Sequence, residues 1–575
     1  MKSILKKEKA QLLTILIVFL ISFVFSYASW GSVLIDCGRE AYIPAAISKG
    51  AVLYKDIFCI YGALPYFVNA LFFKLFGVHI ELLYFIGAIL SFFYIFGFYF
   101  LSREFLSKKI SLALTLLVLF SAIFNPSLFN FIFPYSYAMV FSSLFGLFFV
   151  FCLIKFIKFQ KRCFFYLACV FGGLILCSKM DFAPMLFALA PVILIYKVKL
   201  SDLLRGFALF FAFPILTFLL SLILGASVLD ILSNFSYLTD MINTKSLAYF
   251  YQNHGLGILS PKYIGTTVTF LISAIFIVVI YFQASLFFFR RKNKIVKYFG
   301  LILLTFLLLF SLADDKYVMF LPILAFVIFL FSLFNYLKIK CFKNPTALSY
   351  LILAFCALLS SIKVFYGLHP LLYGSYSLPL LFLVVVRCLD NILENNFLFN
   401  TKKQCQIVLV ILISCYISLY LNLFLSETLS KKITIKTQIG TIKTDETFGK
   451  PSKEMIDYFI EHKNQLSGKK MIVLPEGIMY NFLLDKEWNF YPTSFIPLDF
   501  DTFGDEKLTQ DLLKNRPDYV LFNGRSTEEY QQGAICKSYG VKMCKAIAQN
   551  YDFVAAFGDK FRIYLFKIKD ESGIN

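Results

Sequence analysis

Long apolar runs are the feature of this sequence that most constrains its fold. Leu12 to Ser29, Ile264 to Phe289 and Val318 to Leu337 are near or above the roughly 18 residues that a helix needs to cross a bilayer. Such runs recur through the first three-quarters of the chain. Because 59% of the residues are hydrophobic and only 16% are charged, a set of soluble domains is excluded. The chain is predicted to be a polytopic α-helical membrane protein.

The alternation of apolar runs with basic clusters predicts about thirteen transmembrane helices. The basic start of the chain is placed inside, and the region after Ser426, which has lost the basic bias, is placed outside. Residues 1–426 are expected to form the transmembrane domain, with long outer loops at 30–81 and 225–263. The expected spans are 11–29, 82–102, 110–125, 137–154, 163–178, 182–197, 205–224, 264–289, 298–313, 318–337, 344–361, 376–389 and 407–426.

The net charge of +20 lies on one side of the predicted membrane. Segments predicted to face inward contain 25 Lys and Arg residues and 5 acidic residues, whereas the region after Ser426 contains 21 of each kind. This asymmetry is the positive-inside bias of a multi-pass protein, here expected in the cytoplasmic (inner) membrane. A nucleic-acid-binding chain would concentrate its basic residues on a soluble domain, so nucleic acid is not an expected partner.

Residues 427–575 are predicted to form a small extracytoplasmic (periplasmic) α/β domain. Buried strands are expected at 469–475, 517–523 and 562–566, with helices at 452–464 and 507–515.

The cysteines show neither a CxxC pair nor a Cys/His grouping with metal-ligand spacing. An oxidising outer compartment would permit disulfides between Cys37 and Cys59 and between Cys536 and Cys544. Sequence separation decides neither bond, because a disulfide depends on the distance between the two Cα atoms.

Charged residues gather directly after the first predicted span. Asp36, Arg39, Glu40 and Asp56 lie in one loop whose neighbours are apolar. A charge buried at the centre of a bilayer costs about 2.5–3.5 kcal/mol on insertion scales, so these side chains are expected to face water, a partner or a site. In the plainer alternative, the loop is solvated and Arg39 pairs with Glu40 or Asp56.

The order of motifs in this loop resembles a known class of membrane enzyme. DCGREAY at 36–42 is followed by GAVLYKD at 50–56, YGALPY at 61–66 and LFG at 75–77. Together they resemble the first outer loop of GT-C superfamily glycosyltransferases, in particular the bacterial relatives of protein O-mannosyltransferase and aminoarabinose transferase. Weaker matches are Lys316-Tyr317 before Leu321-Pro322, Tyr376 to Pro379, Leu474 to Gly477, Arg516 to Tyr519, and Asn550 to Gly558.

The resemblance implies transfer of a sugar from a polyprenyl-phosphate donor to a lipid, glycan or protein acceptor outside the membrane, with inversion. Such a reaction needs a base for the acceptor hydroxyl, and Asp36 matches the acid of the family. Relatives often carry a second acid directly after the first, where this chain has Cys37. Glu40 is therefore expected either to orient the acceptor or to pair with Arg39.

A lipid phosphate leaving group needs cationic stabilisation. Lys179 lies beside Asp181 in a short outer loop, where a Lys–Asp pair at the membrane surface is the plainer alternative. The candidate cations that face outward are Arg39, Lys55, Lys179, Lys245, Lys262, Lys316 and Lys363. The predicted substrate-binding residues are Arg39, Glu40, Tyr54, Asp56, Lys179, Lys316, His369 and Tyr373, the last two in an aromatic rim with Tyr376.

Two further motifs are typical of a metal site and of a modification site. Asp314 and Asp315 could bind a divalent cation through oxygen ligands, but a solvated turn is the favoured interpretation. No other cofactor is predicted. Asn234-Phe235-Ser236 matches the N-glycosylation pattern.

Two other functions would also use lipid-linked saccharides at a membrane. A transporter or flippase for a lipid-linked saccharide would place charged or broken positions near the middle of its spans, but the charges here gather at span ends. A polymerase or ligase of lipid-linked saccharides would be expected to use a large outer loop carrying Arg and His. The loop at 225–263 contains one His and no Arg. The sequence therefore favours a membrane glycosyltransferase.

Overall fold

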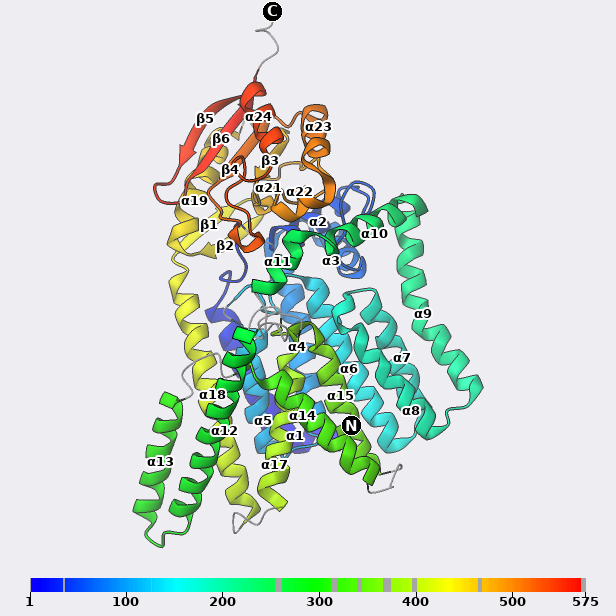
Figure 1. Ribbon diagram of the computed structural model, residues 1–575, viewed down its shortest axis with the longest axis vertical. Coiled ribbons are helices and arrows are strands. Elements are labelled where there is room, and N and C mark those ends of the chain that lie inside the picture. Colours follow the sequence, from blue (N-terminus) through cyan, green and yellow to red (C-terminus); the bar gives the residue numbers. More distant parts are fainter. Residues whose placement is uncertain are drawn as a thin grey trace, which may run out of the picture.

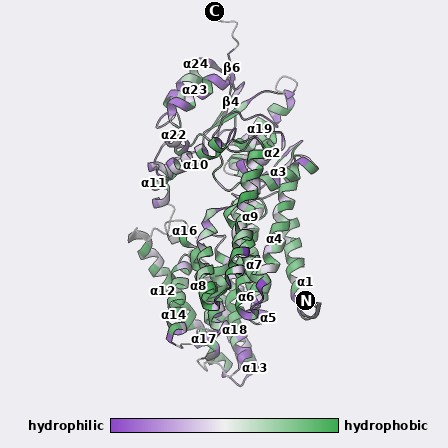
Figure 2. Ribbon diagram, turned by 90° about the vertical axis from the view of Figure 1, so that its right-hand side faces the viewer, coloured by the Kyte–Doolittle hydropathy of each residue, from purple (hydrophilic) through white to green (hydrophobic). Residues whose placement is uncertain are grey.

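The chain folds into a large helical region with a smaller strand-containing region at one end (Figure 1). The computed structural model describes residues 2–34, 37–125, 127–253, 261–311, 318–338, 344–365, 374–395, 401–463 and 468–569. Figure 2 shows hydrophobic residues throughout the helical region and hydrophilic residues concentrated at its ends and in the strand-containing region.

Seven helices among the described residues are long and apolar enough to cross a membrane. They are α1 (Lys2–Phe25), α4 (Ile80–Ser102), α6 (Tyr137–Phe159), α9 (Leu200–Ile223), α12 (Pro261–Phe289), α14 (Leu321–Lys338) and α18 (Lys402–Ser430). Most exposed side chains of α9, such as Phe207, Leu216 and Ile223, are apolar, as expected for a helix that contacts lipid. The chain is a multi-pass membrane protein.

Every predicted span coincides with helix in the described residues. However, seven of these described helices are long and apolar enough to cross a membrane, against the predicted number of about thirteen. The remaining segments form shorter, less apolar or interrupted helices. The interior of α15, for example, is fully buried at Leu353, Ala354 and Cys356, so neighbouring helices surround it. These segments are α5 (Lys108–Val118) with the π-helical turn η1 (Leu119–Ile123), α7 (Arg162–Leu176), the 3₁₀ helix η2 (Met180–Ala188) with α8 (Leu189–Tyr196), α13 (Lys294–Ser311), α15 (Pro345–Ser360) and α17 (Leu378–Asn395).

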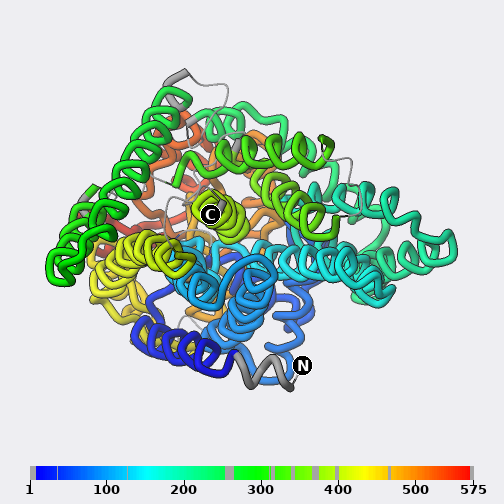
Figure 3. The backbone as a smooth tube through the Cα atoms, turned by 90° about the horizontal axis from the view of Figure 1, so that it is seen from below, coloured from blue at the N-terminus to red at the C-terminus, as the bar shows by residue number. Residues whose placement is uncertain are grey.

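The helices form a broad bundle rather than a single ring. Figure 3 shows α12 and α13 on one side of the helical region and α8 and α9 on the opposite side. The basic turn between α12 and α13, which contains Arg290, Arg291 and Lys292, lies at the end of the molecule away from the strands (Figure 1). The predicted topology requires this separation of the basic turn from the strand-containing region.

Short helices cover the end of the bundle that faces the strands. The first outer loop contributes α2 (Cys37–Ser48) and α3 (Leu64–Phe76), and the loop at 225–263 contributes α10 (Val228–Ile242) and α11 (Lys245–Asn253). A further short helix, α16 (Ile362–Phe365), follows α15. These helices, together with the C-terminal region, surround the candidate site.

The C-terminal region contains a two-stranded hairpin and a mixed four-stranded sheet. Antiparallel β1 (Ile433–Thr437) and β2 (Gly440–Thr444) form the hairpin, and the sheet has the order β3-β4-β6-β5. Strand β3 (Met471–Leu474) is parallel to β4 (Tyr519–Asn523), which is antiparallel to β6 (Ile563–Ile568), as is β5 (Tyr551–Phe557). The helical elements are α19 (Glu446–Glu461), α21 (Ile478–Leu483), α22 (Pro497–Phe503), α23 (Asp505–Asn515), η4 (Glu528–Tyr530) and α24 (Val541–Asn550).

The three strands and two helices predicted from the sequence are present in this region. The hairpin and β5 were not predicted. Strand β5 is largely exposed along its length, so it lacks the buried apolar pattern that marks the other strands of the sheet.

The C-terminal region is fastened to the helical region by backbone contacts. The Lys443 amide donates to the Ala28 carbonyl at 2.8 Å, and the Ile80 amide donates to the Ile439 carbonyl at 2.9 Å. Helix α2 also packs closely on α21, because a Cβ atom on Gly38 would lie 2.4 Å from the Met479 amide nitrogen. Glycine at this position allows the two regions to approach.

One of the two possible disulfides is formed. Cys536 and Cys544 are bonded, whereas Cys37 and Cys59 are buried free thiols, so of the two bonds left open by the sequence only the Cys536–Cys544 bond is formed. Cys37 packs into the large core, while Cys59 packs into a separate small cluster that includes Ile43. The Cys59 thiol donates instead to the Tyr61 carbonyl at 2.9 Å.

Candidate active site between the helices and the C-terminal region

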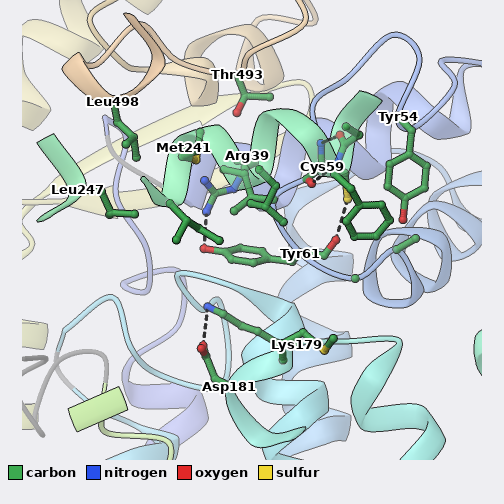
Figure 4. Close-up of a pocket in the computed structure, with 18 of the residues that line it drawn as sticks. Arg39, Tyr54, Cys59, Tyr61, Lys179, Asp181, Met241, Leu247, Thr493 and Leu498 are labelled. Carbon is green, nitrogen blue, oxygen red and sulfur yellow. Dashed lines mark hydrogen bonds and ion pairs between the residues drawn. The ribbon is translucent and has the colours of Figure 1, made fainter. Parts of the chain in front are cut away.

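A cavity of about 950 Å³ lies where the helical region meets the C-terminal region. The first outer loop and the turn between α7 and η2 line one side, and α10 and α11 line another. Figure 4 shows Lys179 and Asp181 on one side of the cavity, with Arg39 and Tyr61 above them. The segment around Thr493, from the C-terminal region, closes the opposite side.

One wall of the cavity is mainly hydrocarbon. Pro214 and Phe218 of α9 face it together with Leu238, Met241 and Ile242 of α10. This wall continues the apolar surface of α9, which is exposed over most of its length. It can therefore accept an apolar chain that enters from the side of the helices.

A glycine holds the first outer loop against the end of α7. The Gly62 amide donates to the Ser178 carbonyl at 2.8 Å, and the Leu64 amide donates to the Cys177 carbonyl at 3.2 Å. A Cβ atom on Gly62 would lie 2.1 Å from the Cys177 carbonyl oxygen, so only glycine permits this approach. The contact places Tyr61 directly beside Lys179.

The Tyr61 ring lies between two cations. The Lys179 Nζ lies 4.1 Å from the ring centroid, and the Arg39 guanidinium carbon lies 5.1 Å from it. Arg39 also donates through Nη2 to the Tyr61 hydroxyl at 3.3 Å. The Tyr135 ring lies within 6 Å of both cations, so two aromatic faces stabilise them.

Lys179 is fixed at its backbone and at its head. Its amide donates to the Ser142 hydroxyl of α6 at 2.9 Å, and that hydroxyl donates to the Lys179 carbonyl at 2.9 Å. Its ammonium group lies 3.5 Å from Asp181 Oδ2, while the Lys363 ammonium lies 3.3 Å from Asp181 Oδ1. One carboxylate thus holds two ammonium groups at the cavity wall.

Glu40 is fully buried behind the cavity and supports Arg39. Its carboxylate lies 3.5 Å from Arg39 Nε and accepts hydrogen bonds from the Tyr66 hydroxyl at 3.2 Å and the Tyr137 amide at 2.8 Å. Burial raises the pKa of Glu40, and Arg39 opposes that shift. Of the two roles expected for Glu40, the structure places it in the pair with Arg39.

The other predicted site residues divide into three groups. Tyr54 lines the cavity with Arg39 and Lys179. Asp56 lies outside the cavity lining, in an exposed turn where its carboxylate accepts a hydrogen bond from the Val52 amide at 2.8 Å. The residues that lie outside the described part of the chain are Asp36, Lys316, His369 and Tyr373, as well as the acidic pair Asp314 and Asp315.

Asn234 joins the wall of the cavity to the first outer loop. Its side chain accepts from the Cys59 amide at 2.8 Å and donates to the Cys59 carbonyl at 2.9 Å. Tyr491 of the C-terminal region also donates to it at 3.1 Å. The side chain is 1% exposed, so the N-glycosylation pattern at this position marks a structural amide and not a glycan acceptor.

The C-terminal region contributes polar groups that sequence reasoning missed. Thr493, Ser494, Glu476 and Asp499 line the cavity. Of these, only Glu476 lies in a sequence motif, the weak match at Leu474 to Gly477, and that motif does not mark it as a site residue. Asp499 accepts from the Ser494 hydroxyl at 2.6 Å and from the Ile496 amide at 3.1 Å. Burial raises the pKa of Asp499 to about 7, although these hydrogen bonds and Arg39 oppose the shift.

Within the described ranges, no group of three or more His, Cys, Asp or Glu side chains is arranged to hold a metal ion. The charged groups at this cavity are instead arranged as ion pairs and cation–π contacts.

No protein-family model and no curated protein sequence matches this chain. Similar solved structures include ArnT from Cupriavidus metallidurans bound to undecaprenyl phosphate, at 12% identity and a TM-score of 0.43, covering 98% of this chain and 99% of that one. Another is the Archaeoglobus fulgidus oligosaccharyltransferase tethered to an acceptor peptide with the NVT sequon, at 12% identity and a TM-score of 0.45, covering 99% of this chain and 75% of that one.

Proposed function

We propose that this chain is an inverting glycosyltransferase that moves a sugar from a polyprenyl-phosphate donor to an acceptor on the outer side of the cytoplasmic membrane. The observation that carries the proposal is the composition of the cavity of about 950 Å³ between the helices and the C-terminal region, called the main cavity below. A hydrocarbon wall from α9 and α10 adjoins a polar end that holds Arg39, Lys179 and Lys363 beside two tyrosine rings. A lipid with a long apolar tail and a phosphate head matches both parts.

The cations are proposed to bind the lipid phosphate. As the bond between sugar and phosphate breaks, negative charge grows on the phosphate oxygens, and fixed cations in a partly buried site stabilise that charge strongly. Arg39 and Lys179 are both held against the Tyr61 ring, so little reorganisation is needed when phosphate binds. Tyr54 is proposed to contact the substrate from the same wall.

The other predicted contacts are proposed to act differently. Glu40 is proposed to act through Arg39, and Asp56 through the conformation of its turn. Lys316, His369 and Tyr373 remain proposed substrate contacts from the outer loops, with no described geometry.

Asp36 is proposed as the general base, and it directly precedes α2 in the sequence. The acceptor hydroxyl oxygen would attack the anomeric carbon while Asp36 takes the hydroxyl proton. The bond from the anomeric carbon to the phosphate oxygen breaks, and its electron pair leaves with the polyprenyl phosphate. Attack from the face opposite the leaving phosphate inverts the anomeric centre, and such base catalysis typically contributes about 10²–10⁴-fold.

The proposal is tested by mass spectrometry of glycolipids, envelope glycans and glycoproteins from cells that lack this chain. The expected result is the loss of one sugar from one of these acceptors, with accumulation of the corresponding polyprenyl-phosphate sugar. Re-expression of the wild-type chain should restore the sugar. An envelope that is unchanged in composition would contradict the proposal.

A further inference from the structure

A second cavity, of about 490 Å³, lies within the C-terminal region. Its floor consists of three aromatic rings from the sheet, Phe522 of β4 and Tyr564 and Phe566 of β6. The register pairs Phe522 with Tyr564, which places these side chains on the same face of the sheet. All three rings are only partly buried, so this face presents apolar surface to the cavity.

The walls of the second cavity are built from two connected loops. Arg525 and Ser526 line it from one loop, and Ile535 and Cys536 line it from the other. The Thr527 hydroxyl donates to the Gly533 carbonyl, which ties the loops together. The disulfide from Cys536 to Cys544 attaches the second loop to α24, so the cavity has a fixed shape.

One ion pair separates the second cavity from the main cavity. Glu476 lines the main cavity, Arg525 lines the second, and their side chains are paired. The Asn523 amide, also in the lining of the second cavity, donates to the Glu476 carbonyl at 2.5 Å. A molecule that occupied both cavities would therefore have to pass this ion pair.

The charges at the second cavity do not favour an anion. Arg525 contacts Glu476 and also lies 2.7 Å from Glu529, and Glu528 is a further lining residue. Since carboxylates outnumber the single guanidinium, a phosphate or carboxylate ligand would meet net negative charge. Partly buried rings beside hydroxyl, amide and carboxylate groups instead suit a ligand with an apolar C–H face and a hydroxyl edge.

We propose that the second cavity binds a neutral saccharide unit of the acceptor, away from the reacting hydroxyl. This inference rests on the proposed function, because the donor is assigned to the hydrocarbon-lined side of the main cavity. An acceptor longer than one sugar unit would then span both cavities.

The test uses the full-length protein in lipid nanodiscs and native mass spectrometry. The saccharide probe is the neutral oligosaccharide fraction released from the envelope of the source cells, and the donor-side probe is undecaprenyl phosphate. Tyr564→Ala removes a ring of the floor, and Ser526→Trp fills the cavity from an exposed wall position. Phe553→Ala is the matched control, because this ring is 59% exposed on the same sheet face but does not line the cavity.

Wild type and Phe553→Ala are expected to bind an oligosaccharide, with at least tenfold weaker binding in Tyr564→Ala and Ser526→Trp. Undecaprenyl phosphate should bind all four proteins equally. Unchanged oligosaccharide binding in both cavity variants, or none in the wild type, would overturn the inference. Absence of undecaprenyl phosphate binding in the wild type would instead overturn the proposed function, and with it the acceptor role of this cavity.

Discussion

At the scale of single residues, Asp181 determines how strongly Lys179 and Lys363 can bind an anionic ligand. Its two carboxylate oxygens lie 3.5 Å from the Lys179 ammonium and 3.3 Å from the Lys363 ammonium. A lipid phosphate that binds to either lysine must compete with this internal carboxylate. In the proposed reaction, the same competition would favour release of the polyprenyl phosphate after each turnover.

Asp181→Asn should therefore tighten the binding of undecaprenyl phosphate. Removing the competing charge is expected to lower the Kd by about tenfold, which corresponds to about 1.4 kcal/mol. Microscale thermophoresis in nanodiscs measures this Kd, and Asp56→Asn serves as the control because Asp56 lies in an exposed turn outside the cavity lining. Weaker binding in Asp181→Asn, as expected for Lys179→Ala, would show that Asp181 only orders the lysines.

At the scale of elements, the contact between the first outer loop and the end of α7 creates the polar end of the main cavity. Gly62 allows that contact because its backbone lies directly on Cys177 and Ser178. Any side chain at Gly62 would separate the Tyr61 ring from Lys179. The loop and the helix end therefore depend on each other for the site.

Gly62→Ala should weaken both the fold and the binding of phosphate. A Cβ atom 2.1 Å from a carbonyl oxygen forces a backbone shift, and overpacking of this kind typically costs about 1–3 kcal/mol. Gly265→Ala in α12 is the matched control, since nothing lies within 4 Å of its added Cβ. The melting temperature and the binding of undecaprenyl phosphate should fall only in the Gly62 variant, since alanine in a helix interior is no less stable than glycine. Equal melting temperatures for the two variants would contradict this account of the contact.

Asp499 at the start of α22 should make stability depend on pH. Its pKa is about 7 in the folded protein, against about 3.9 for an unfolded Asp. Between these values the folded state keeps a proton that the unfolded chain has released, so the free energy of unfolding falls as the pH rises from about 4 to about 7. The full effect is on the order of 4 kcal/mol.

Asp499→Asn should remove this dependence. The difference in melting temperature, variant minus wild type, is expected to be larger at pH 8 than at pH 5. Asp511→Asn on α23 serves as the carboxyl-to-amide control. Melting temperatures at the two pH values, measured in one detergent, provide the comparison. A stability difference that is the same at both pH values would rule out titration of Asp499 as the cause.

At the scale of the whole molecule, the main cavity needs segments that are far apart in the sequence. Arg39, Lys179, Lys363 and Asp499 come from the first outer loop, the α7–η2 turn, α16 and α22. None of these segments could form the cavity alone. The C-terminal region is therefore part of the site and not an appended domain.

Much of this arrangement could be predicted from the sequence. Apolar runs and buried strand patterns marked the helices and three strands of the sheet. The first-loop motifs marked Arg39 and Tyr54, and the need for an outward cation marked Lys179; all three line the cavity. Asp499 and Thr493 could not be predicted, because their place depends on how the C-terminal region packs on α2, α10 and α11. The pairing of Asp181 with Lys363 could not be predicted either, because 182 positions separate the two residues in sequence.

The central claim is that this chain transfers a sugar from a polyprenyl-phosphate lipid. The direct measurement is liquid chromatography with mass spectrometry of polyprenyl-phosphate lipids extracted from cells lacking the chain, after incubation with purified protein and envelope from the same cells. The wild type should convert one polyprenyl-phosphate sugar to free polyprenyl phosphate and add that sugar to the envelope, whereas Asp36→Asn should slow this transfer by about 10²–10⁴-fold. Unchanged lipids after incubation with folded wild-type protein, or full transfer by Asp36→Asn, would contradict the account.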